Sequence, residues 1–190
     1  ITKELNGVSR TTVENYIQFL ESANLIYQSW PVDMAGKKVL KARPKIYIAD
    51  AAIRNAVLMD DSIMTDPTGM GKVVETAVYK HIAAFYYQFA TSVGYFRGGR
   101  KNKEIDVVVD YPNIKNILIE VKYREGAPIA DDDAIVELCE EASAAIVVTK
   151  TATDFGVHNT PSGKNLLRIP AFAFLYLLGN AEKHGYRGIE

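Results

Sequence analysis

Apolar residues near the start of the chain follow first a helical and then a strand-like pattern. Three of them recur at the spacing of an amphipathic helix with one buried face: Val13, Ile17 and Leu20. Ser9 precedes this helix at a position suited to a capping residue. A shorter segment comes before it, so the two segments follow a helix-turn-helix pattern. Strand-like runs at 25–32 and 45–48 come next, and we expect them to form a β-hairpin.

A second unit is predicted after residues 60–71, an acidic stretch with glycines that is typical of a linker. Apolar residues then return at helical spacing, at Val74, Val78, Ile82, Phe85 and Phe89. The remaining pattern predicts three strands, an acidic helix, two strands and a helix that begins after Pro170. These elements span residues 93–97, 104–110, 117–123, 131–143, 145–149, 166–169 and 171–178. Their order is typical of an α/β protein.

Length and composition exclude several classes of protein. The 190 residues allow two compact domains, and we expect a winged-helix-like domain at 1–60 and a second domain at 61–190. No apolar run reaches the ~18 residues that cross a membrane, so no membrane partner is expected. The single cysteine, Cys139, excludes an internal disulfide, which favours a cytoplasmic location. The first residue is Ile1, so we interpret the chain as a fragment.

Candidate chemistry lies on two neighbouring predicted strands. Glu120 and Lys122 are two residues apart, so their side chains leave the sheet on one face. If 111–115 form a hairpin loop, opposed residue numbers add up to 226, which places Asp106 across from Glu120. Two carboxylates ~5 Å apart repel each other by about 3 kcal/mol at an effective dielectric constant of ~20. Lys122 offsets part of this repulsion, and a divalent cation such as Mg²⁺ would offset more.

This pattern predicts a metal-dependent reaction at a phosphate group. Asp106 and Glu120 would hold Mg²⁺ or Mn²⁺, and Glu75 on the predicted core helix would complete the metal ligands. Lys122 would position a water or stabilise the charge of the transition state. Structural roles are the alternatives. Glu75 can interact favourably with the helix dipole, and Asp106 can form a partly buried ion pair with Lys122.

At these four positions the sequence resembles the PD-(D/E)XK nuclease-like superfamily. Its pattern is a helical Glu, a strand Asp and Glu-x-Lys on the next strand, and Glu75, Asp106, Glu120 and Lys122 match it in order. Ile105 stands where many members have Pro before the Asp. The resemblance implies an α/β, restriction-endonuclease-like mixed sheet flanked by helices and preceded by a winged-helix domain.

More closely, the chain resembles the C-terminal region of bacterial and archaeal AAA+-type ATPases, in which a winged helix precedes a nuclease-like domain of unknown function. The supporting stretches are T-V-E-N-Y-I-Q-F-L-E-S-A-N-L-I-Y, R-P-K-I-Y-I-A-D, G-K-V-V-E, K-E-I-D-V-V-V-D, L-I-E-V-K-Y and R-I-P-A-F-A-F-L. The resemblance implies an ATPase domain N-terminal to this chain as a partner. No Gly-Lys pair completes a GxxxxGK[ST] phosphate loop, so we expect no ATP site in the chain itself.

Two basic clusters are candidates for nucleic-acid contact. The first lies at the predicted hairpin and the second leads into the Asp106 strand: Lys37, Lys38, Lys41, Arg43 and Lys45, then Arg97, Arg100, Lys101 and Lys103. Such residues give salt-dependent contacts to phosphates that do not depend on sequence. The net charge of −1 makes nucleic-acid binding depend on such local patches. Solvated loops are the alternative interpretation.

Together these observations predict a DNA-binding, nuclease-like module of an AAA+-type ATPase that hydrolyses phosphodiesters with a metal ion. The alternative is a catalytically inactive module that binds nucleic acid or another protein. The winged helix would either contact DNA or pack on the ATPase domain.

Overall fold

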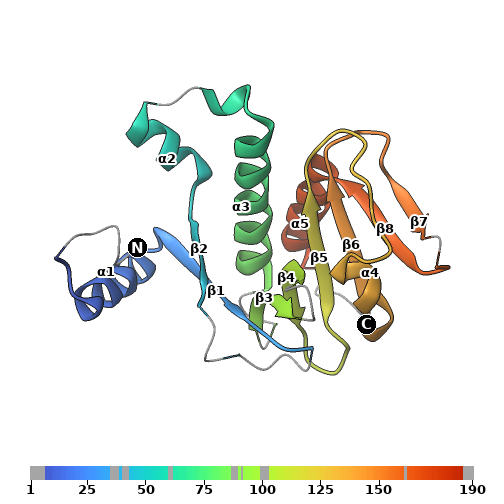
Figure 1. Ribbon diagram of the computed structural model, residues 1–190, viewed down its shortest axis with the longest axis horizontal. Helices are drawn as coiled ribbons and strands as arrows, with labels where there is room; N and C mark the ends of the chain where they lie inside the picture. The colour runs from blue at the N-terminus through green and yellow to red at the C-terminus, as the bar shows by residue number, and fades with distance from the viewer. Residues whose placement is uncertain are drawn as a thin grey trace.

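Helices lie against both faces of one mixed, eight-stranded β-sheet in the computed structural model of the chain (Figure 1). The structure describes residues 7–34, 39, 43–59, 62–86, 90, 92–98, 103–160 and 162–185. The helices are α1 (Arg10–Ser22), α2 (Ala51–Leu58), α3 (Pro67–Tyr86), α4 (Ala134–Leu138) and α5 (Ala171–His184), with 3-10 turns η1 (Ser62–Met64) and η2 (Cys139–Glu141). In this described part of the chain, none of the helices has the length and apolar character needed to cross a lipid bilayer.

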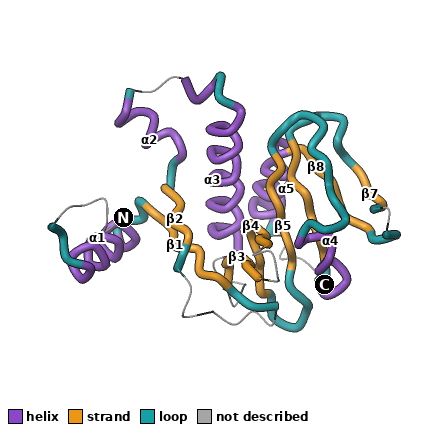
Figure 2. Tube along the Cα trace, in the orientation of Figure 1, coloured by secondary structure: helices purple, strands orange, loops and turns teal. Residues whose placement is uncertain are grey.

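The strands form a sheet in the order β2-β1-β3-β4-β5-β6-β8-β7 (Figure 2). Their bounds are β1 (Ile26–Pro31), β2 (Lys45–Ile48), β3 (Ser92–Gly98), β4 (Lys103–Asp110), β5 (Ile117–Lys122), β6 (Ala144–Thr149), β7 (Gly156–Asn159) and β8 (Asn165–Pro170). The β1–β3, β5–β6 and β6–β8 pairs are parallel, and the other pairs are antiparallel. The predicted α/β class is confirmed.

The N-terminal hairpin is part of this larger sheet. β1 and β2 pair antiparallel, as the sequence predicts, and β1 also pairs parallel to β3, with Trp30 opposite Gly94. The sheet therefore runs across the expected domain boundary after residue 60. The division of the chain into a winged-helix domain and a second domain stays a prediction.

Local sequence explains where several elements begin. The Ser9 side chain accepts a hydrogen bond from the Thr12 amide at 3.1 Å, as expected of the residue that caps α1. Asp50 caps α2 in the same way, through the amide of Ala52 at 2.9 Å, and the sequence analysis did not foresee that helix. The helix predicted at 131–143 is shorter, because Asp133 occupies the N-cap position of α4 and a 3-10 turn follows α4 directly.

Two buried apolar clusters cover the two faces of the sheet. The cluster on the face of α3 and α5 includes Val78, Ile82, Val107, Val109, Ile119 and Phe174. The cluster on the face of α4 includes Ile105, Val108, Leu118, Ile135 and Val136. We call these the α3 face and the α4 face. The predicted core helix is confirmed as α3, in which Val78 and Ile82 are fully buried.

A register shift changes the alternation of β4 just beside Asp106. Ile105 and Val107 are two residues apart and nevertheless lie on different faces of the sheet. The cause is an irregularity in the pairing of β3 with β4 between Gly94 and Phe96, where the register changes. In an unbroken strand, residues two apart share a face. The shift therefore lets Asp106, between the two, reach groups on the α3 face.

The junction between β1 and β3 predicts a sensitive glycine. A Cβ atom on Gly94 would lie 2.3 Å from the Trp30 carbonyl oxygen, a backbone atom that cannot move without displacing β1. We expect Gly94→Ala to lower the free energy of unfolding by about 1–3 kcal/mol, measured by urea denaturation. Hydrogen exchange should also show faster opening of β1.

Gly71→Ala is the matched control, because a Cβ at this α3 position meets nothing within 4 Å. It should leave stability unchanged or raise it by up to about 1 kcal/mol, since alanine favours helix. Equal unfolding curves for the two variants would contradict the tight β1–β3 junction.

Candidate active site

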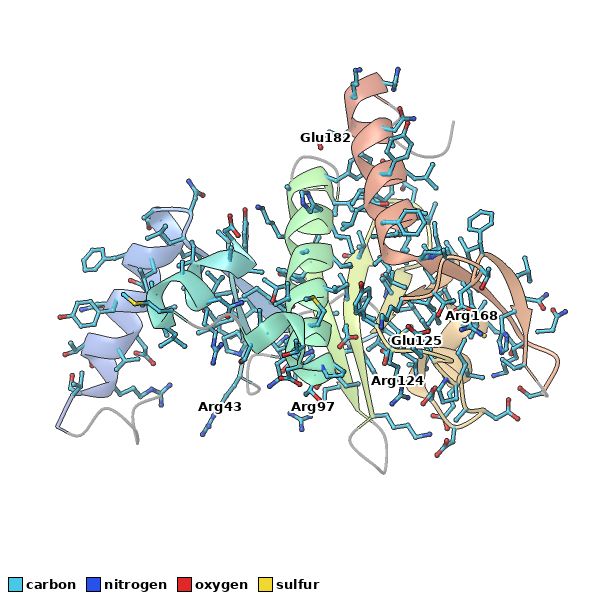
Figure 3. All side chains as sticks on the ribbon, turned by 90° about the horizontal axis from the view of Figure 1, so that it is seen from above. Arg43, Arg97, Arg124, Glu125, Arg168 and Glu182 are labelled. Atoms are coloured by element: carbon cyan, nitrogen blue, oxygen red, sulfur yellow. The ribbon has the colours of Figure 1, made fainter. Side chains whose placement is uncertain are left out.

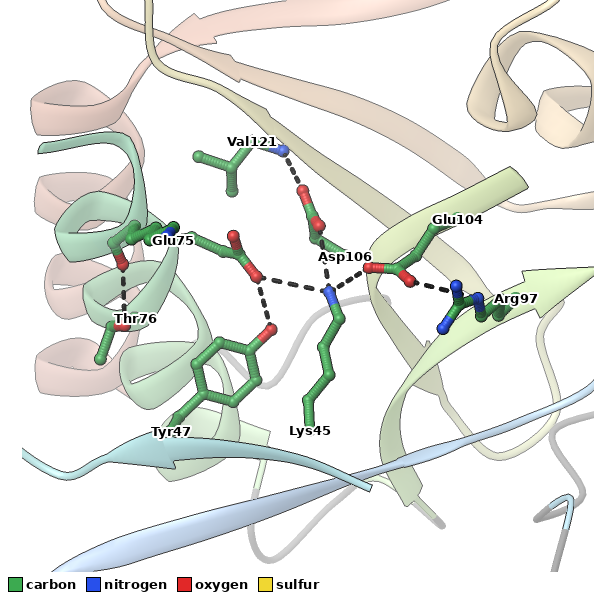
Figure 4. A network of polar contacts seen from close by, with 9 residues as sticks. Lys45, Tyr47, Glu75, Thr76, Arg97, Glu104, Asp106 and Val121 are labelled. Carbon is green, nitrogen blue, oxygen red and sulfur yellow. Dashed lines mark hydrogen bonds and ion pairs between the residues drawn. The ribbon is translucent and has the colours of Figure 1, made fainter. Parts of the chain in front are cut away.

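One lysine and several acids from distant parts of the chain meet beside α3 (Figure 4). Glu75 lies on α3, Glu104 and Asp106 lie on β4, and Lys45 and Tyr47 lie on β2. Lys45 and Tyr47 are two residues apart on a strand, so both point to the same side, toward Glu75. We call these five residues the acidic site.

The ammonium of Lys45 lies among three carboxylates. Its Nζ is 2.5 Å from Glu104 Oε1, 3.4 Å from Glu75 Oε1 and 3.4 Å from Asp106 Oδ1. Burial disfavours the charged form of Lys45, but Asp106, Glu104 and Glu75 outweigh that effect and raise its pKa above the usual value. Lys45 is therefore a permanent cation, and it neutralises only part of the negative charge around it.

Tyr47 fixes the position of Glu75. Its hydroxyl donates a hydrogen bond to Glu75 Oε1 at 2.7 Å, and its ring stacks on Tyr79 with centroids 4.2 Å apart. Burial, followed by the charge of Glu75, raises the pKa of Tyr47 far above its usual range. The hydroxyl consequently stays protonated and remains a donor to the carboxylate.

Asp106 lies where β4 and β5 meet. The predicted hairpin register is confirmed, because Val107 pairs with Ile119 and Val109 with Ile117. The Asp106 carboxylate accepts a hydrogen bond from the Val121 amide at 2.9 Å and contacts Lys45 with its other oxygen. Burial and the charge of Glu75 raise the pKa of Asp106, although Lys45 opposes this rise.

Glu120 and Lys122 point to the other side of the sheet. They alternate on β5 with Leu118, which belongs to the α4 face. Lys122 Nζ is 2.6 Å from Asp133 Oδ2, at the N-terminus of α4. Glu120 Oε2 is buried and has no hydrogen-bond partner among the described residues. Burial, followed by the charge of Asp106, raises the pKa of Glu120 to about 8.

The structure thus groups the predicted site residues differently from the sequence analysis. It brings Glu75 and Asp106 together, and Glu120 lies close enough to Asp106 for their charges to interact. Lys122 contacts Asp133, so the alternative of an ion pair between Asp106 and Lys122 is wrong. The lysine that contacts Asp106 is Lys45.

Sequence reasoning missed Tyr47 and Glu104, and it assigned Lys45 to a basic cluster. The available signal was the two-residue spacing in Lys45-x-Tyr47 and in Glu104-x-Asp106, which puts each pair on one side of a strand where alternation is regular. Only the folded chain shows that the Lys45 side chain reaches both Glu75 on α3 and Asp106 on β4.

The predicted nucleic-acid residues divide into two groups. Five lie outside the described residues: Lys37, Lys38, Lys41, Arg100 and Lys101. Among the others, Lys45 belongs to the acidic site, Lys103 Nζ is 2.5 Å from Glu137, and Arg97 Nε is 3.9 Å from Glu104. Arg43 is exposed, and Figure 3 shows Arg43 and Arg97 projecting on the same side of the molecule.

The donor set fits a divalent cation in chemistry and charge. Carboxylate oxygens are the ligands that Mg²⁺ and Mn²⁺ prefer, and the three acids around Lys45 outnumber the single ammonium. As the side chains lie, no group of three or more His, Cys, Asp or Glu residues in the described ranges could hold a metal ion. The acids converge on a point that Lys45 Nζ occupies, so a cation fits only with that ammonium moved away.

Two models of known protein families match parts of this chain. The model of a domain of unknown function (DUF4143) matches residues 70–172, more than half of the chain, and the chain belongs to this family. The model of a second domain of unknown function (DUF8612) matches residues 1–63. DUF4143 domains often occur at the C-terminus of AAA-type ATPases. No curated protein and no solved structure matched the chain. The acidic site therefore takes residues from both matched segments, Lys45 and Tyr47 from the first and the acids from the second.

The raised pKa of Glu120 predicts that the protein becomes less stable as the pH rises. Between its usual pKa of 4.5 and its folded value of about 8, the folded chain holds a proton that the unfolded chain releases. We expect the free energy of unfolding to fall by up to about 1.4 kcal/mol per pH unit across that window, measured by urea denaturation. Asp106 adds to the slope in the same direction, since its pKa is also raised.

Glu120→Gln cannot titrate and keeps nearly the same shape, so it should flatten this slope. Glu182→Gln, which removes an exposed carboxylate on α5, is the control and should retain the slope of the wild type. A Glu120→Gln protein with the full wild-type slope would show that Glu120 is not the buried proton carrier.

Proposed function

We propose that this chain is a nuclease-like module that hydrolyses phosphodiester bonds of nucleic acid, DNA in the first instance, with Mg²⁺ or Mn²⁺. The observation that carries the proposal is the convergence of Glu75, Glu104 and Asp106 on one cation position. Partly buried acids that outnumber their positive partners are unfavourable for the fold alone. Such a cluster, in which burial raises the pKa of Asp106, is typical of functional sites.

Each residue of the site has a role in this proposal. Asp106 and Glu75 would hold the cation, and Tyr47 keeps Glu75 aimed at it through the 2.7 Å hydrogen bond. Glu104, with an oxygen 2.5 Å from Lys45 Nζ, would be the third ligand, whereas Glu120 lies on the opposite face of the sheet, where its charge interacts with that of Asp106. A bound cation would lower the pKa of a coordinated water and offset the charge that develops on the phosphate. Lys45, the lysine next to Asp106, can stabilise the same charge.

We further propose a PD-(D/E)XK nuclease-like fold for the mixed sheet, with the N-terminal segment as a winged helix. Supporting this assignment are Glu75 on a helix, Asp106 on β4 and Glu120 with Lys122 on the adjacent β5. In the full-length protein an ATPase domain of the AAA type would be the partner. Arg43 and Arg97, with the basic residues near them in the sequence, would contact nucleic-acid phosphates.

A specific observation favours a second, non-enzymatic function. Lys45 already neutralises part of the acidic site, and Lys122 is engaged by Asp133. In a binding module, the Lys45 contacts would serve only to hold the β1–β2 hairpin on the sheet, and the Lys122–Asp133 pair would hold α4 against β5. The two functions differ in what loss of the Asp106 charge does.

Asp106→Asn tests the enzymatic proposal. The substitution keeps the shape of the side chain and removes the charge that a cation needs. In the wild type, Mn²⁺ at ~100 times its dissociation constant should stabilise the fold by about 2.7 kcal/mol relative to EDTA. Asp106→Asn should abolish this thermal shift and any Mn²⁺-dependent cleavage of DNA, and it should remain folded.

Asp110→Asn is the matched control, because Asp110 is the aspartate at the other end of β4, where it pairs with Ser92. It should keep both the Mn²⁺ shift and the cleavage. If Mn²⁺ gives no shift in the wild type even with DNA present, the enzymatic function is wrong. If Asp106→Asn changes stability and neither protein shows an Mn²⁺ shift or Mn²⁺-dependent cleavage, the binding module is favoured.

A further inference from the structure

We propose that Lys45 is an internal plug of the acidic site, and that a divalent cation binds only when it displaces the Lys45 ammonium. This inference rests on the proposed function, since it concerns how that site is loaded. It also assigns a regulatory role to the N-terminal segment. Lys45 lies in the segment matched at 1–63, and the acids that it contacts lie in the segment matched at 70–172.

The distances make the two cations mutually exclusive. Lys45 Nζ lies 3.4 Å from oxygens of both Glu75 and Asp106, so it occupies the space between the two carboxylates. Mg²⁺ requires carboxylate oxygens at about 2.0–2.1 Å and would sit in the same space. A divalent ion in that space would strongly repel an ammonium that stayed next to it. Binding of the ion therefore requires Lys45 to move.

The surroundings allow the side chain to leave while its strand stays in place. Lys45 is the first residue of β2, and its side chain is 24% exposed, so it has a path to solvent. The backbone on either side is held, because the Tyr95 hydroxyl donates to the Arg43 carbonyl at 2.8 Å and Tyr47 is bound to Glu75. A long, flexible side chain can thus swing out without unfolding the hairpin.

Lys122 does not share this property. Its ammonium is paired with Asp133 on the α4 face, and its side chain is only 12% exposed. Cation binding at the acidic site therefore leaves Lys122 in place. The two lysines provide an internal comparison within one molecule.

The first experiment measures Mn²⁺ affinity of the 190-residue chain by isothermal titration calorimetry. Lys45→Met removes the competing ammonium and keeps the apolar stem, so the dissociation constant for Mn²⁺ should fall at least about tenfold. Lys183→Met, at an exposed position of α5, changes the net charge equally and should leave the constant within about twofold.

The second experiment uses the wild type, because Lys45→Met leaves partly buried acids without their cation and can impair folding. Amine acylation followed by mass spectrometry reports how accessible each lysine is. Lys45 should label slowly in EDTA and several times faster in saturating Mn²⁺, whereas the labelling of Lys122 should not change.

The outcomes separate this inference from the proposed function. Tighter Mn²⁺ binding by Lys45→Met, or faster Lys45 labelling in Mn²⁺, supports the plug, even if the wild type binds Mn²⁺ too weakly to measure. Mn²⁺ binding that depends on Asp106 but leaves Lys45 labelling and the Lys45→Met affinity unchanged would overturn the plug and retain the metal site. No Mn²⁺ binding by the wild type or by Lys45→Met would overturn both.

Discussion

The ammonium of Lys45 holds together a site that would otherwise be a set of repelling charges. Glu75, Glu104 and Asp106 come from a helix and a central strand, and none of them is fully exposed to water that could screen the others. Carboxylates in such surroundings repel strongly unless a cation lies among them. The same contacts attach β2 to α3 and β4, so one side chain connects the N-terminal hairpin to the acids. Charge balance and architecture consequently depend on each other.

Two irregular features of the backbone make this arrangement possible. Gly94 allows β1 to approach β3 closely, which brings the hairpin onto the sheet. The register shift beside it alters the alternation of β4 next to Asp106, so that this carboxylate meets Lys45 on the α3 face. On the other face, Lys122 is paired with the N-terminus of α4. The α3 face is therefore partly neutralised by Lys45 among three acids, and the α4 face by Lys122 paired with Asp133.

The sequence predicted the helix with Glu75 and the pairing of β4 with β5, because both follow from local periodicity and a short loop. It also placed Asp106 opposite Glu120 in the pairing of β4 with β5. It could not predict the lysine, since Lys45 reaches Asp106 across 61 positions of sequence through the placement of a whole hairpin. The register shift that turns Asp106 toward α3 is likewise a tertiary feature, with no signal in the alternation of Ile105, Val107 and Val109.

Lys45 and Asp106 stabilise each other within the acidic site. A double-mutant cycle with Lys45→Met and Asp106→Asn, measured by urea denaturation at neutral pH without metal, isolates this interaction. We expect a coupling of at least about 1 kcal/mol, with Lys45→Met costing less stability when Asp106 is already neutral. Additive effects of the two substitutions would contradict it, because they would mean that the ammonium and the carboxylate do not interact in the folded protein.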